Sequence, residues 1–332
     1  MTDTPTFSVL LPFFNDRETL GEAIESVLAQ TYESWELLAI DDGSNDGSAE
    51  LADGFAANDA RIRVLHRPNG GGAAARNTGL AVAQGRYCAL LDADDLWLPA
   101  KLERQLPLLE PDTVVFSDAY VEEDGARYLY GRRAQQPDGV YPRGRVFDEL
   151  LRHNFIPSNL TAVVPTELLR SVGGFDATMP RPSSPDWELW LRLALADIRF
   201  DFVAEPLAVY RIRGGSQSQN GEAVRKAVIV VLRKMRERTT GSKRTAVKRR
   251  LRIANRELEV FHRKWAWEAA ASGDARAARQ SLIAALRANP RSARAVAGVA
   301  LVPVPPLVRW YARRQPPTNF AGRFVHDDGP RD

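Results

Sequence analysis

The sequence predicts an α/β protein built on a doubly wound, mostly parallel sheet, with a basic helical region at its C-terminal end. Three observations support this prediction. Apolar segments of strand length alternate with helix-length segments through the first hundred residues, which is typical of right-handed β–α–β crossovers. Polar residues gather directly after several strand-like segments. Past residue 220 the composition becomes rich in Arg, Ala and Leu, with a mostly helical pattern.

Four short apolar segments have the length and composition of buried strands. They are 7–11 (FSVLL), 35–40 (WELLAI), 61–66 (RIRVLH) and 87–91 (YCALL). A helix is expected at 19–30, where apolar residues recur with helical spacing. A second helix follows the turn-rich stretch 41–48, and a third is expected at 73–83 (AAARNTGLAVA).

The rest of the chain contains fewer strand-like segments. Further strands are expected at 113–120, 161–164 and 200–212, and one helix at 186–196. The tail is mostly helical to about residue 287, with Gly273 and Asp274 at the turn of a helical hairpin that Pro290 ends. The chain is therefore expected to divide into residues 1–112, 113–220 and 221–332.

Three carboxylates, Asp92, Asp94 and Asp95, follow the fourth strand at once. An acid beside a core must be hydrated, paired or bound to a cation. The D-x-D spacing can offer oxygens to one hard divalent ion, and a phosphate would complete the shell. This pattern indicates chemistry on a nucleotide diphosphate. The alternative is a polar turn that caps a helix at 101–109.

Polar residues also follow the first two strands, at 12–16 and at Asp41 and Asp42. In open α/β sheets, ligands bind beyond the carboxyl ends of the strands. These residues and the Asp cluster are all expected at that edge. We therefore predict that the active site lies there.

The bulk composition is ordinary for a globular protein, with 44% hydrophobic and 26% charged residues in a chain of 332. The N-terminal apolar run is too short for a signal peptide, and no stretch approaches the roughly 20 apolar residues that span a bilayer. The single cysteine, Cys88, is expected in the core and permits no intramolecular disulfide. A cytoplasmic protein is predicted.

The net charge of +3 conceals an uneven distribution. Residues 221–332 hold about 25 of the 45 basic and about 9 of the 42 acidic residues. The body of the chain is therefore acidic and the tail basic. This split suggests a metal-dependent site joined to a segment that meets an anionic surface.

The residues resemble the inverting family 2 glycosyltransferases, enzymes of the Rossmann-like GT-A fold, over about residues 7–220. The resemblance rests on seven motifs that occur in the family's order. They are SVLLPFFND at 8–16, LLAIDDGSNDGS at 37–48, GGGAAARNTGL at 70–80, LLDADD at 90–95, VGGFDATM at 172–179, PDWELWLRL at 185–193 and YRIRGGSQS at 210–218.

The resemblance implies that the first part of the chain, 1–112, binds a nucleotide diphosphate sugar. Pro12, Phe14 and Asn15 are implied to line the pocket for base and ribose. Asp42 is implied to accept a hydrogen bond from the base, which favours a UDP- or dTDP-sugar. Asp41 is interpreted instead as a turn former, because Asp before Gly-Ser readily makes such turns.

The Asp cluster and the Ala-Arg-Asn motif complete the implied donor site. Asp92 would hold the ribose, and Asp94 would bind the Mn²⁺ or Mg²⁺ ion that bridges the diphosphate. Asp95 is interpreted as a cap of the following helix. Arg76 and Asn77 either reach the nucleotide or brace this Asp-rich edge.

In 113–220, the implied acceptor-binding and catalytic part, Asp186 matches the family's general base. Inversion requires the acceptor hydroxyl to lose its proton as it attacks. The alternative is that Asp186 only N-caps the helix at 186–196, and both roles are compatible. Trp187 and Trp190 are interpreted as divided between core packing and an apolar wall for sugar.

Two departures from the family pattern matter. Pro185 stands where the family usually has Glu, which leaves the base but removes an acid. Arg213 stands where a His is common. Arg does not ligate cations, but its guanidinium can clamp diphosphate oxygens. Few protein contacts to the metal are therefore expected.

The predicted function is transfer of one sugar, with inversion, to a saccharide or lipid-linked saccharide in cell-surface polysaccharide or glycoconjugate synthesis. One alternative is a polyprenyl-phosphate glycosyltransferase, whose anionic acceptor needs no base. The other is a non-catalytic scaffold protein that binds nucleotide sugars.

The basic tail is expected to contact the inner face of the membrane peripherally, with 296–308 and Trp310 in the headgroup region. The alternative is a solvated helical pair that packs on the catalytic domain or a second subunit. Nucleic acid is not favoured as a partner, because the tail shows no aromatic-interleaved basic strand or recognition-helix motif.

Overall fold

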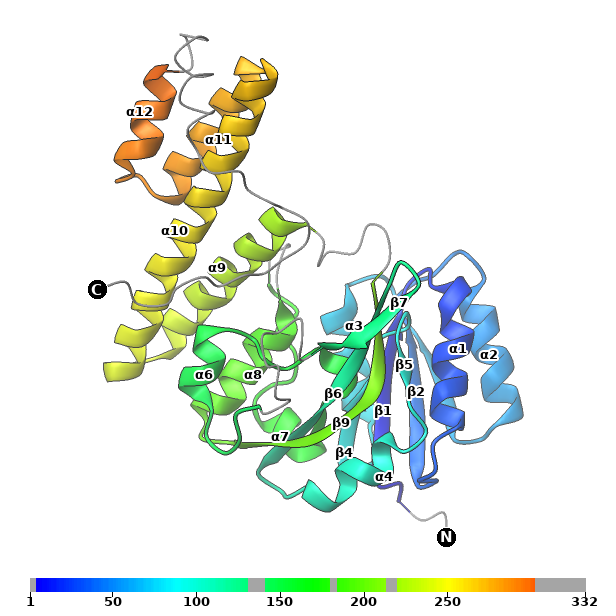
Figure 1. Ribbon diagram of the computed structural model, residues 1–332. Helices are drawn as coiled ribbons and strands as arrows, with labels where there is room; N and C mark the ends of the chain where they lie inside the picture. The colour runs from blue at the N-terminus through cyan, green and yellow to red at the C-terminus, as the bar shows by residue number, and fades with distance from the viewer. Residues whose placement is uncertain (1–3, 131–140, 180–183, 213–219, 302–332) are drawn as a thin grey trace. The chain divides into compact units, whose positions relative to one another are not determined.

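The computed structural model describes residues 4–130, 141–179, 184–212 and 220–301 (Figure 1). The chain divides into two compact units. The first unit contains all the described strands and the helices that cover them, and the second contains the helices of the C-terminal region.

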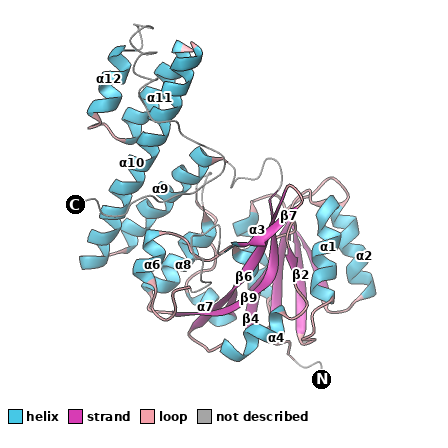
Figure 2. Ribbon diagram, viewed as in Figure 1, coloured by secondary structure: helices cyan, strands magenta, loops and turns pink. Residues whose placement is uncertain are grey.

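The strands of the first unit form one sheet (Figure 2). They are β1 Phe7–Phe13, β2 Trp35–Asp41, β3 Ile62–His66, β4 Tyr87–Leu90, β5 Leu96–Trp97, β6 Thr113–Glu123, β7 Ala126–Leu129, β8 Val163–Pro165 and β9 Arg199–Ile212. Their order is β3-β2-β1-β4-β8-β6-β9-β5, and β7 pairs with β6. The first four strands are mutually parallel, as are β6 and β9, whereas β5, β7 and β8 pair antiparallel.

The helices of this unit occupy the connections between strands. They are α1 Arg17–Leu28, α2 Ser48–Asn58, α3 Gly72–Val82, α4 Lys101–Gln105, α6 Phe147–Arg152, α7 Thr166–Ser171 and α8 Pro185–Leu195. The three helices α1, α2 and α3 alternate with the four parallel strands as the sequence predicts. The segment 101–109 is shorter as an α-helix than expected, because a 3₁₀ turn at Leu106–Leu108 that contains a proline follows α4.

Helices cover both faces of the parallel strands. Ile24 of α1 belongs to the same buried cluster as Val9 and Leu11 of β1. Leu10 points to the other face, since side chains alternate along a strand. There Gly79 of α3 approaches so closely that a Cβ would lie 3.0 Å from Leu10 Cδ2. The doubly wound arrangement predicted from the sequence is therefore confirmed.

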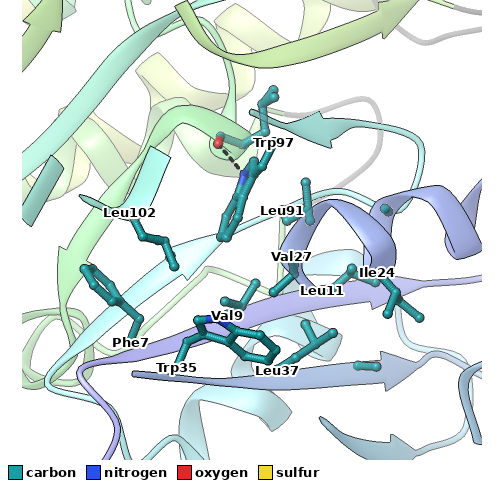
Figure 3. Packing of buried hydrophobic residues seen from close by; sticks show 14 of the residues in the cluster. Phe7, Val9, Leu11, Ile24, Val27, Trp35, Leu37, Leu91, Trp97 and Leu102 are labelled. Atoms are coloured by element: carbon teal, nitrogen blue, oxygen red, sulfur yellow. Dashed lines mark hydrogen bonds between the residues drawn. The ribbon is translucent and has the colours of Figure 1, made fainter. Parts of the chain in front are cut away.

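The main core lies between β1, β2 and α1 and continues towards β5 and α4 (Figure 3). All seven residues of β1 are buried, as are all seven of β2. The Trp97 indole also lies in this core, and its Nε1–H donates to the Leu160 carbonyl oxygen at 2.9 Å. Each large apolar side chain buried here contributes about 1.5–3 kcal/mol. This packing fixes the strand ends from which the polar loops start.

One ammonium group is enclosed by the same part of the fold. Lys101 has no exposed area, and its Nζ donates to Gln105 Oε1 and to the Thr161 carbonyl oxygen, the latter at 3.4 Å. It also lies 4.7 Å from the centre of the Trp97 ring. Burial lowers the pKa of Lys101 to about 7. Cys88 is buried as expected.

The later strands of the first unit agree with the sequence at β6, β8 and β9. The expected helix at 186–196 is α8, which begins one residue earlier. The short elements β5, β7, α6 and α7 were not predicted. Each has six residues or fewer, too few to show a clear periodicity.

The second unit consists of α9 Gly221–Arg238, α10 Gly241–Ser272, α11 Ala275–Ala288 and α12 Ala293–Leu301. Gly273 ends α10 in the left-handed conformation, with a φ of 92°. Asp274 caps α11 by accepting a hydrogen bond from the Ala277 N–H at 2.9 Å. The predicted hairpin is confirmed. Trp267 of α10 packs with Leu282 of α11 in its core.

No helix among the described residues is both long enough and apolar enough to cross a membrane. Most of the apolar segment expected at the headgroup region, including Trp310, lies outside the described residues.

Candidate active site

Three neighbouring parallel strands bring the predicted polar residues to one edge of the sheet (Figure 1). β1 lies between β2 and β4, with Phe13 opposite Asp41 and Leu10 opposite Leu90. The loops that follow these three strands therefore start at the same edge. In open α/β sheets this edge is where ligands bind.

The loop after β1 is tied to the loop after β2. Asn15 has a left-handed backbone with a φ of 57°. Its N–H donates to Ser44 Oγ at 3.1 Å, and its Oδ1 accepts from the Asn45 N–H at 2.8 Å. Pro12 is buried at the end of β1, whereas Phe14 is 46% exposed. An exposed aromatic ring beside a polar loop offers a face on which a flat ligand can stack.

The carboxylate of Asp42 is buried among donors from the loop 67–71, which follows β3. It accepts hydrogen bonds from Arg67 Nη1, from the Gly71 N–H at 2.6 Å and from the Gly70 N–H at 3.1 Å. A carboxylate has about four lone-pair sites, so these internal donors use most of its capacity. Sequence reasoning missed Arg67, because its partner lies 25 residues earlier in the chain.

Asp41 forms a turn, as interpreted from the sequence. Its Oδ1 accepts from the Ser44 N–H at 2.8 Å, and its Oδ2 lies 3.1 Å from His66 Nδ1. Burial alone would raise the pKa of Asp41, but the hydrogen bonds from Ser44 and His66 hold it below its usual range. The hydrogen bond to Asp41 in turn raises the pKa of His66.

Arg76 and Asp92 form an ion pair at the centre of this edge. The Arg76 side chain is only 8% exposed, and its Nη2 donates to Asp92 Oδ1. Its guanidinium lies 5.4 Å from the centre of the Phe175 ring. The Arg76 Nε–H is buried and has no hydrogen-bond partner among the described residues. In this arrangement Arg76 braces the Asp-rich edge.

Asp94 and Asp95 differ in their surroundings. Asp94 is partly exposed, whereas Asp95 is buried and accepts from the Arg211 N–H of β9 at 2.9 Å. Burial, together with the charges of Asp94 and Asp92, raises the pKa of Asp95 well above its usual value. The interpretation of Asp95 as a helix cap is wrong. The N-cap residue of α4 is Ala100, and no side chain caps that helix.

Asp186 lies in the first turn of α8. The helix begins at Pro185, so Asp186 is its second residue, and the alternative that it is the N-cap is wrong. Proline suits a first helical position, since its fixed φ fits and no N–H is left unsatisfied. Asn154 Nδ2 donates to Asp186 Oδ2 at 3.4 Å. Sequence reasoning had no signal for this contact.

The pKa of Asp186 connects it with the rest of the edge. Burial raises this pKa, the negative charge of Asp92 raises it further, and the Arg76 guanidinium lowers it. These couplings mean that Asp186 lies within electrostatic range of the Arg76–Asp92 ion pair. A carboxyl group with a raised pKa accepts a proton more readily than an ordinary Asp near neutral pH.

The loop at 172–176 is fixed to α3 by Asn77. The Asn77 Nδ2 donates to the Phe175 carbonyl oxygen at 2.7 Å, and its Oδ1 accepts from the Phe175 N–H at 2.8 Å. Gly174 has a φ of 66°, and a Cβ there would lie 2.4 Å from Asn77 Oδ1. Asn77 therefore places the Phe175 ring against Arg76, which is a bracing role.

The same loop is also fixed to α8. Arg192 donates to the Val172 carbonyl oxygen at 2.5 Å and to the Gly174 carbonyl oxygen at 2.8 Å. Its guanidinium also pairs with the fully buried Glu188, at 2.8 Å. The helix that carries Asp186 and the loop that supports Arg76 are thus joined through one arginine.

Two of the three remaining predicted residues, Trp187 and Trp190, lie in α8. Trp187 and Trp190 are buried, and the Trp187 indole N–H donates to the Leu150 carbonyl oxygen at 2.8 Å. Both belong to the core, so the interpretation that they also form a sugar wall is wrong. Arg213 lies outside the described residues.

The carboxylates of Asp92 and Asp94 suit a hard cation such as Mg²⁺ or Mn²⁺, which prefers oxygen ligands. Both residues are partly exposed at the edge. Among the described residues, no group of three or more His, Cys, Asp or Glu side chains is arranged to hold a metal ion. A cation here would therefore have few protein ligands, with substrate oxygens and water completing its shell.

Comparison with protein families finds a match to the model of glycosyl transferase family 2 over residues 8–170. The putative teichuronic acid biosynthesis glycosyltransferase TuaG of Bacillus subtilis is 31% identical over 65% of this chain and 82% of its own length. The Escherichia coli enzyme WfgD, named as a UDP-Glc:alpha-D-GlcNAc-diphosphoundecaprenol beta-1,3-glucosyltransferase, is 32% identical over 64% of this chain and 79% of its own length.

An uncharacterized glycosyltransferase of Rickettsia felis is 34% identical over 64% of this chain, but the match spans only 34% of that protein. Among solved structures, S. aureus TarS with UDP-GlcNAc has a TM-score of 0.60 at 16% identity, covering 93% of this chain and 91% of the other. A Pyrobaculum calidifontis mannosyltransferase with GDP-Man and Mn²⁺ has a TM-score of 0.58 at 20% identity, covering 94% and 84%. These likenesses establish the GT-A fold.

Proposed function

Because the chain belongs to glycosyltransferase family 2, we propose that it moves a single sugar, with inversion, from a nucleotide diphosphate sugar to a saccharide or lipid-linked saccharide. The reaction would serve cell-surface polysaccharide or glycoconjugate synthesis. The names of TuaG and WfgD support this proposal, since one refers to teichuronic acid and the other to a diphosphoundecaprenol acceptor.

The observation that carries the proposal is the ion pair of Arg76 and Asp92 at the carboxyl edge of the sheet, with Asp94 partly exposed beside it. Asp186 takes the proton from the attacking hydroxyl of the acceptor, and its raised pKa suits a base that works near neutral pH. Asn154 orients the receiving carboxylate. The pair of Arg76 and Asp92 fixes the donor side opposite this base.

The donor would occupy the loops after β1, β2 and β4. Pro12, Phe14 and Asn15 line the base and ribose, with Phe14 offering its exposed ring for stacking. Asp42 and Arg67 form the polar side of the base pocket, through the guanidinium that Asp42 holds in place. A UDP- or dTDP-sugar is the favoured donor, because the acceptor capacity left on Asp42 suits the ring N–H of uracil or thymine and the name of WfgD includes UDP-Glc.

The ribose and the diphosphate of the donor involve five further residues. Asp92 would hold the ribose, and Asp94 would bind Mn²⁺ or Mg²⁺. Arg76 supports Asp92 through their ion pair, and Asn77 supports Arg76 by placing the Phe175 ring against it. A cation bound there neutralises charge that develops on the departing diphosphate. The Mn²⁺ present with GDP-Man in the Pyrobaculum mannosyltransferase supports this assignment. Arg213 would clamp diphosphate oxygens with its planar guanidinium.

The same proposal divides the chain by role. Residues 1–112 bind the nucleotide sugar, 113–220 bind the acceptor and supply Asp186, and the basic region 221–332 contacts an anionic surface. A cytoplasmic protein held peripherally at the inner face of the membrane fits a lipid-linked acceptor.

Two substitutions test the proposed roles. Asp186→Asn should lower turnover by about 10²–10⁴-fold, the usual contribution of a general base, and still bind the donor. Asp94→Ala should lose both turnover and the effect of added cation on donor binding. The matched control is Asp124→Asn in the exposed β6–β7 turn, where a φ of 50° suits Asn equally well.

Other outcomes would assign a different function. Turnover that is unchanged in Asp186→Asn would favour an acceptor that is already an anion, such as a polyprenyl phosphate. Donor binding without turnover for any acceptor would favour a scaffold protein. Full activity in Asp94→Ala would remove that residue from the donor site.

A further inference from the structure

The N-terminal half of α10 carries positive charge without interruption. Between residues 241 and 256 the sequence has seven Lys or Arg residues and no Asp or Glu. At a rise of about 1.5 Å per residue, this stretch is a rigid rod about 24 Å long. Such a charge run on a continuous helix differs from a charge run in a loop, because the spacing of its charges is fixed.

The helical spacing gathers five of these residues on one side. Arg244, Lys248, Arg252 and Arg256 are four residues apart, and Arg249 lies beside them; all five are exposed. We call these five residues the basic face of α10. The opposite side of this stretch carries buried apolar residues such as Val247 and Ala254. Those residues leave the basic face directed outward.

The acidic side chains of the neighbouring turns have partners of their own. Glu257 pairs with Arg250 at 3.3 Å. Glu259 pairs with Arg263 at 3.1 Å and also accepts from Ser292 Oγ at 2.7 Å. These acids are therefore engaged away from the basic face, and its charge is not cancelled by them.

We infer that the basic face of α10 docks on the anionic surface of a lipid bilayer. The inference rests on the proposed function, in which a lipid-linked acceptor brings the enzyme to a membrane. Clusters of four to eight Lys or Arg residues on a helix are attracted to anionic lipids, with a contribution of about fivefold in affinity for each residue. Five such residues on one rod are enough for peripheral docking.

This docking is electrostatic adsorption and not insertion. The large apolar side chain exposed beside the basic face is Ile253, at 42%, which is little compared with the apolar face of an inserting helix. The sequence had instead indicated the apolar segment 296–308 as the contact. Adsorption through charge weakens steeply with added salt, whereas insertion of apolar side chains does not. Salt dependence therefore separates the two.

The test is co-sedimentation of the full-length chain with vesicles of phosphatidylglycerol and phosphatidylcholine, at low and at high salt. The wild type should bind at low salt and be released at high salt, and should ignore vesicles of phosphatidylcholine alone. The variant K248E/R252E/R256E should lose at least about 100-fold in affinity, since each reversal removes about fivefold or more. Neutral K248Q/R252Q/R256Q should lose less.

The matched control is R276E/R279E/R287E, which makes the same change of charge at three exposed arginines of α11. It should retain most of the binding. All variants should show unchanged circular dichroism, because the altered side chains are exposed. An equal loss in both triple-Glu variants would overturn the inference, since net charge alone would then explain binding. Salt-resistant binding to phosphatidylcholine would overturn it in favour of insertion.

A fluorescent duplex oligonucleotide provides a third arm. If it binds more tightly than anionic vesicles at the same salt, the basic face is a nucleic-acid surface and the inference is wrong. Donor-nucleotide binding is measured on the same proteins. Vesicle docking without any nucleotide-sugar binding would reject the proposed function alone, whereas nucleotide-sugar binding without vesicle docking would reject this inference alone.

Discussion

A buried lysine gives the most direct prediction at the scale of single residues. The pKa of Lys101 is lowered by burial to about 7, whereas in the unfolded chain it is about 10.4. The folded state therefore resists protonation of Lys101, and the contribution of this residue to stability falls as the pH decreases from about 10 to about 7. Below that range Lys101 is protonated in both the folded and the unfolded state, so it causes no further loss of stability.

Lys101→Met should remove this dependence. Relative to the wild type, the free energy of unfolding of the variant should increase by on the order of 3 kcal/mol between pH 10 and pH 7. Urea denaturation at several pH values measures the difference. Lys226→Met, at an exposed lysine, should leave the pH dependence unchanged. Parallel curves for Lys101→Met and the wild type would show that Lys101 keeps its ordinary pKa.

At this scale the sequence identified which residues are polar at the strand ends, but not how they pair. Asp42 was expected to accept a hydrogen bond from the base of the donor. Its carboxylate instead accepts hydrogen bonds from Arg67 and from two glycine N–H groups. Asp95 was expected to serve the helix after it, yet it accepts from Arg211, 116 residues later. Periodicity carries no information on such distant partners, because they depend on how strands are ordered in the sheet.

At the scale of elements, the link between α8 and the loop at 172–176 has a consequence for catalysis. Arg192→Lys keeps the positive charge but loses the planar guanidinium. That group donates at once to Glu188 and to two backbone carbonyl oxygens. The loop then holds Phe175 and Arg76 less precisely. A displacement of about 1 Å at reacting groups costs about 10²-fold, so kcat should fall by about 10–100-fold with a smaller change in donor KM.

The matched control is Arg170→Lys on α7. Arg170 also donates to two carbonyl oxygens, those of Leu80 and Ala83, and pairs with Glu167. It does not serve the loop at 172–176 in these contacts. Steady-state kinetics at a temperature where both variants are folded should show a loss of kcat in Arg192→Lys alone. Equal losses would mean that general loosening, and not the position of this loop, limits turnover.

Helices and strands that contain a long pattern of apolar residues were predicted well, whereas the short helices and strands were not predicted. β1, β2 and the hairpin of α10 and α11 follow from apolar segments and from Gly273 and Asp274. β5 has two residues and exists because it pairs with β9, so its own sequence could not reveal it.

At the scale of the whole molecule, ligand binding should stabilise the folded state. At a concentration of 100 times Kd, a donor adds about 2.7 kcal/mol to the free energy of unfolding. For a unit of about 200 residues this raises Tm by about 5–10 °C. A thermal-shift panel of UDP-, dTDP-, GDP- and CDP-sugars, with and without Mn²⁺ or Mg²⁺, should show the largest shift for a UDP- or dTDP-sugar with cation.

If the two compact units unfold separately, only the transition of the unit with the sheet should move. A shift that is independent of the cation would argue against Asp94 as a metal ligand. No shift with any donor would argue against the donor site as a whole.

The two consecutive glycines of the loop at 172–176 limit how this loop can be redesigned. Both have positive φ, but a Cβ at Gly173 would meet no atom within 4 Å, whereas one at Gly174 would collide with the amide of Asn77. Asn, which tolerates this backbone region, is therefore an admissible substitution at 173. At position 174 only glycine fits. A directed-evolution library should therefore vary position 173 and keep glycine at position 174.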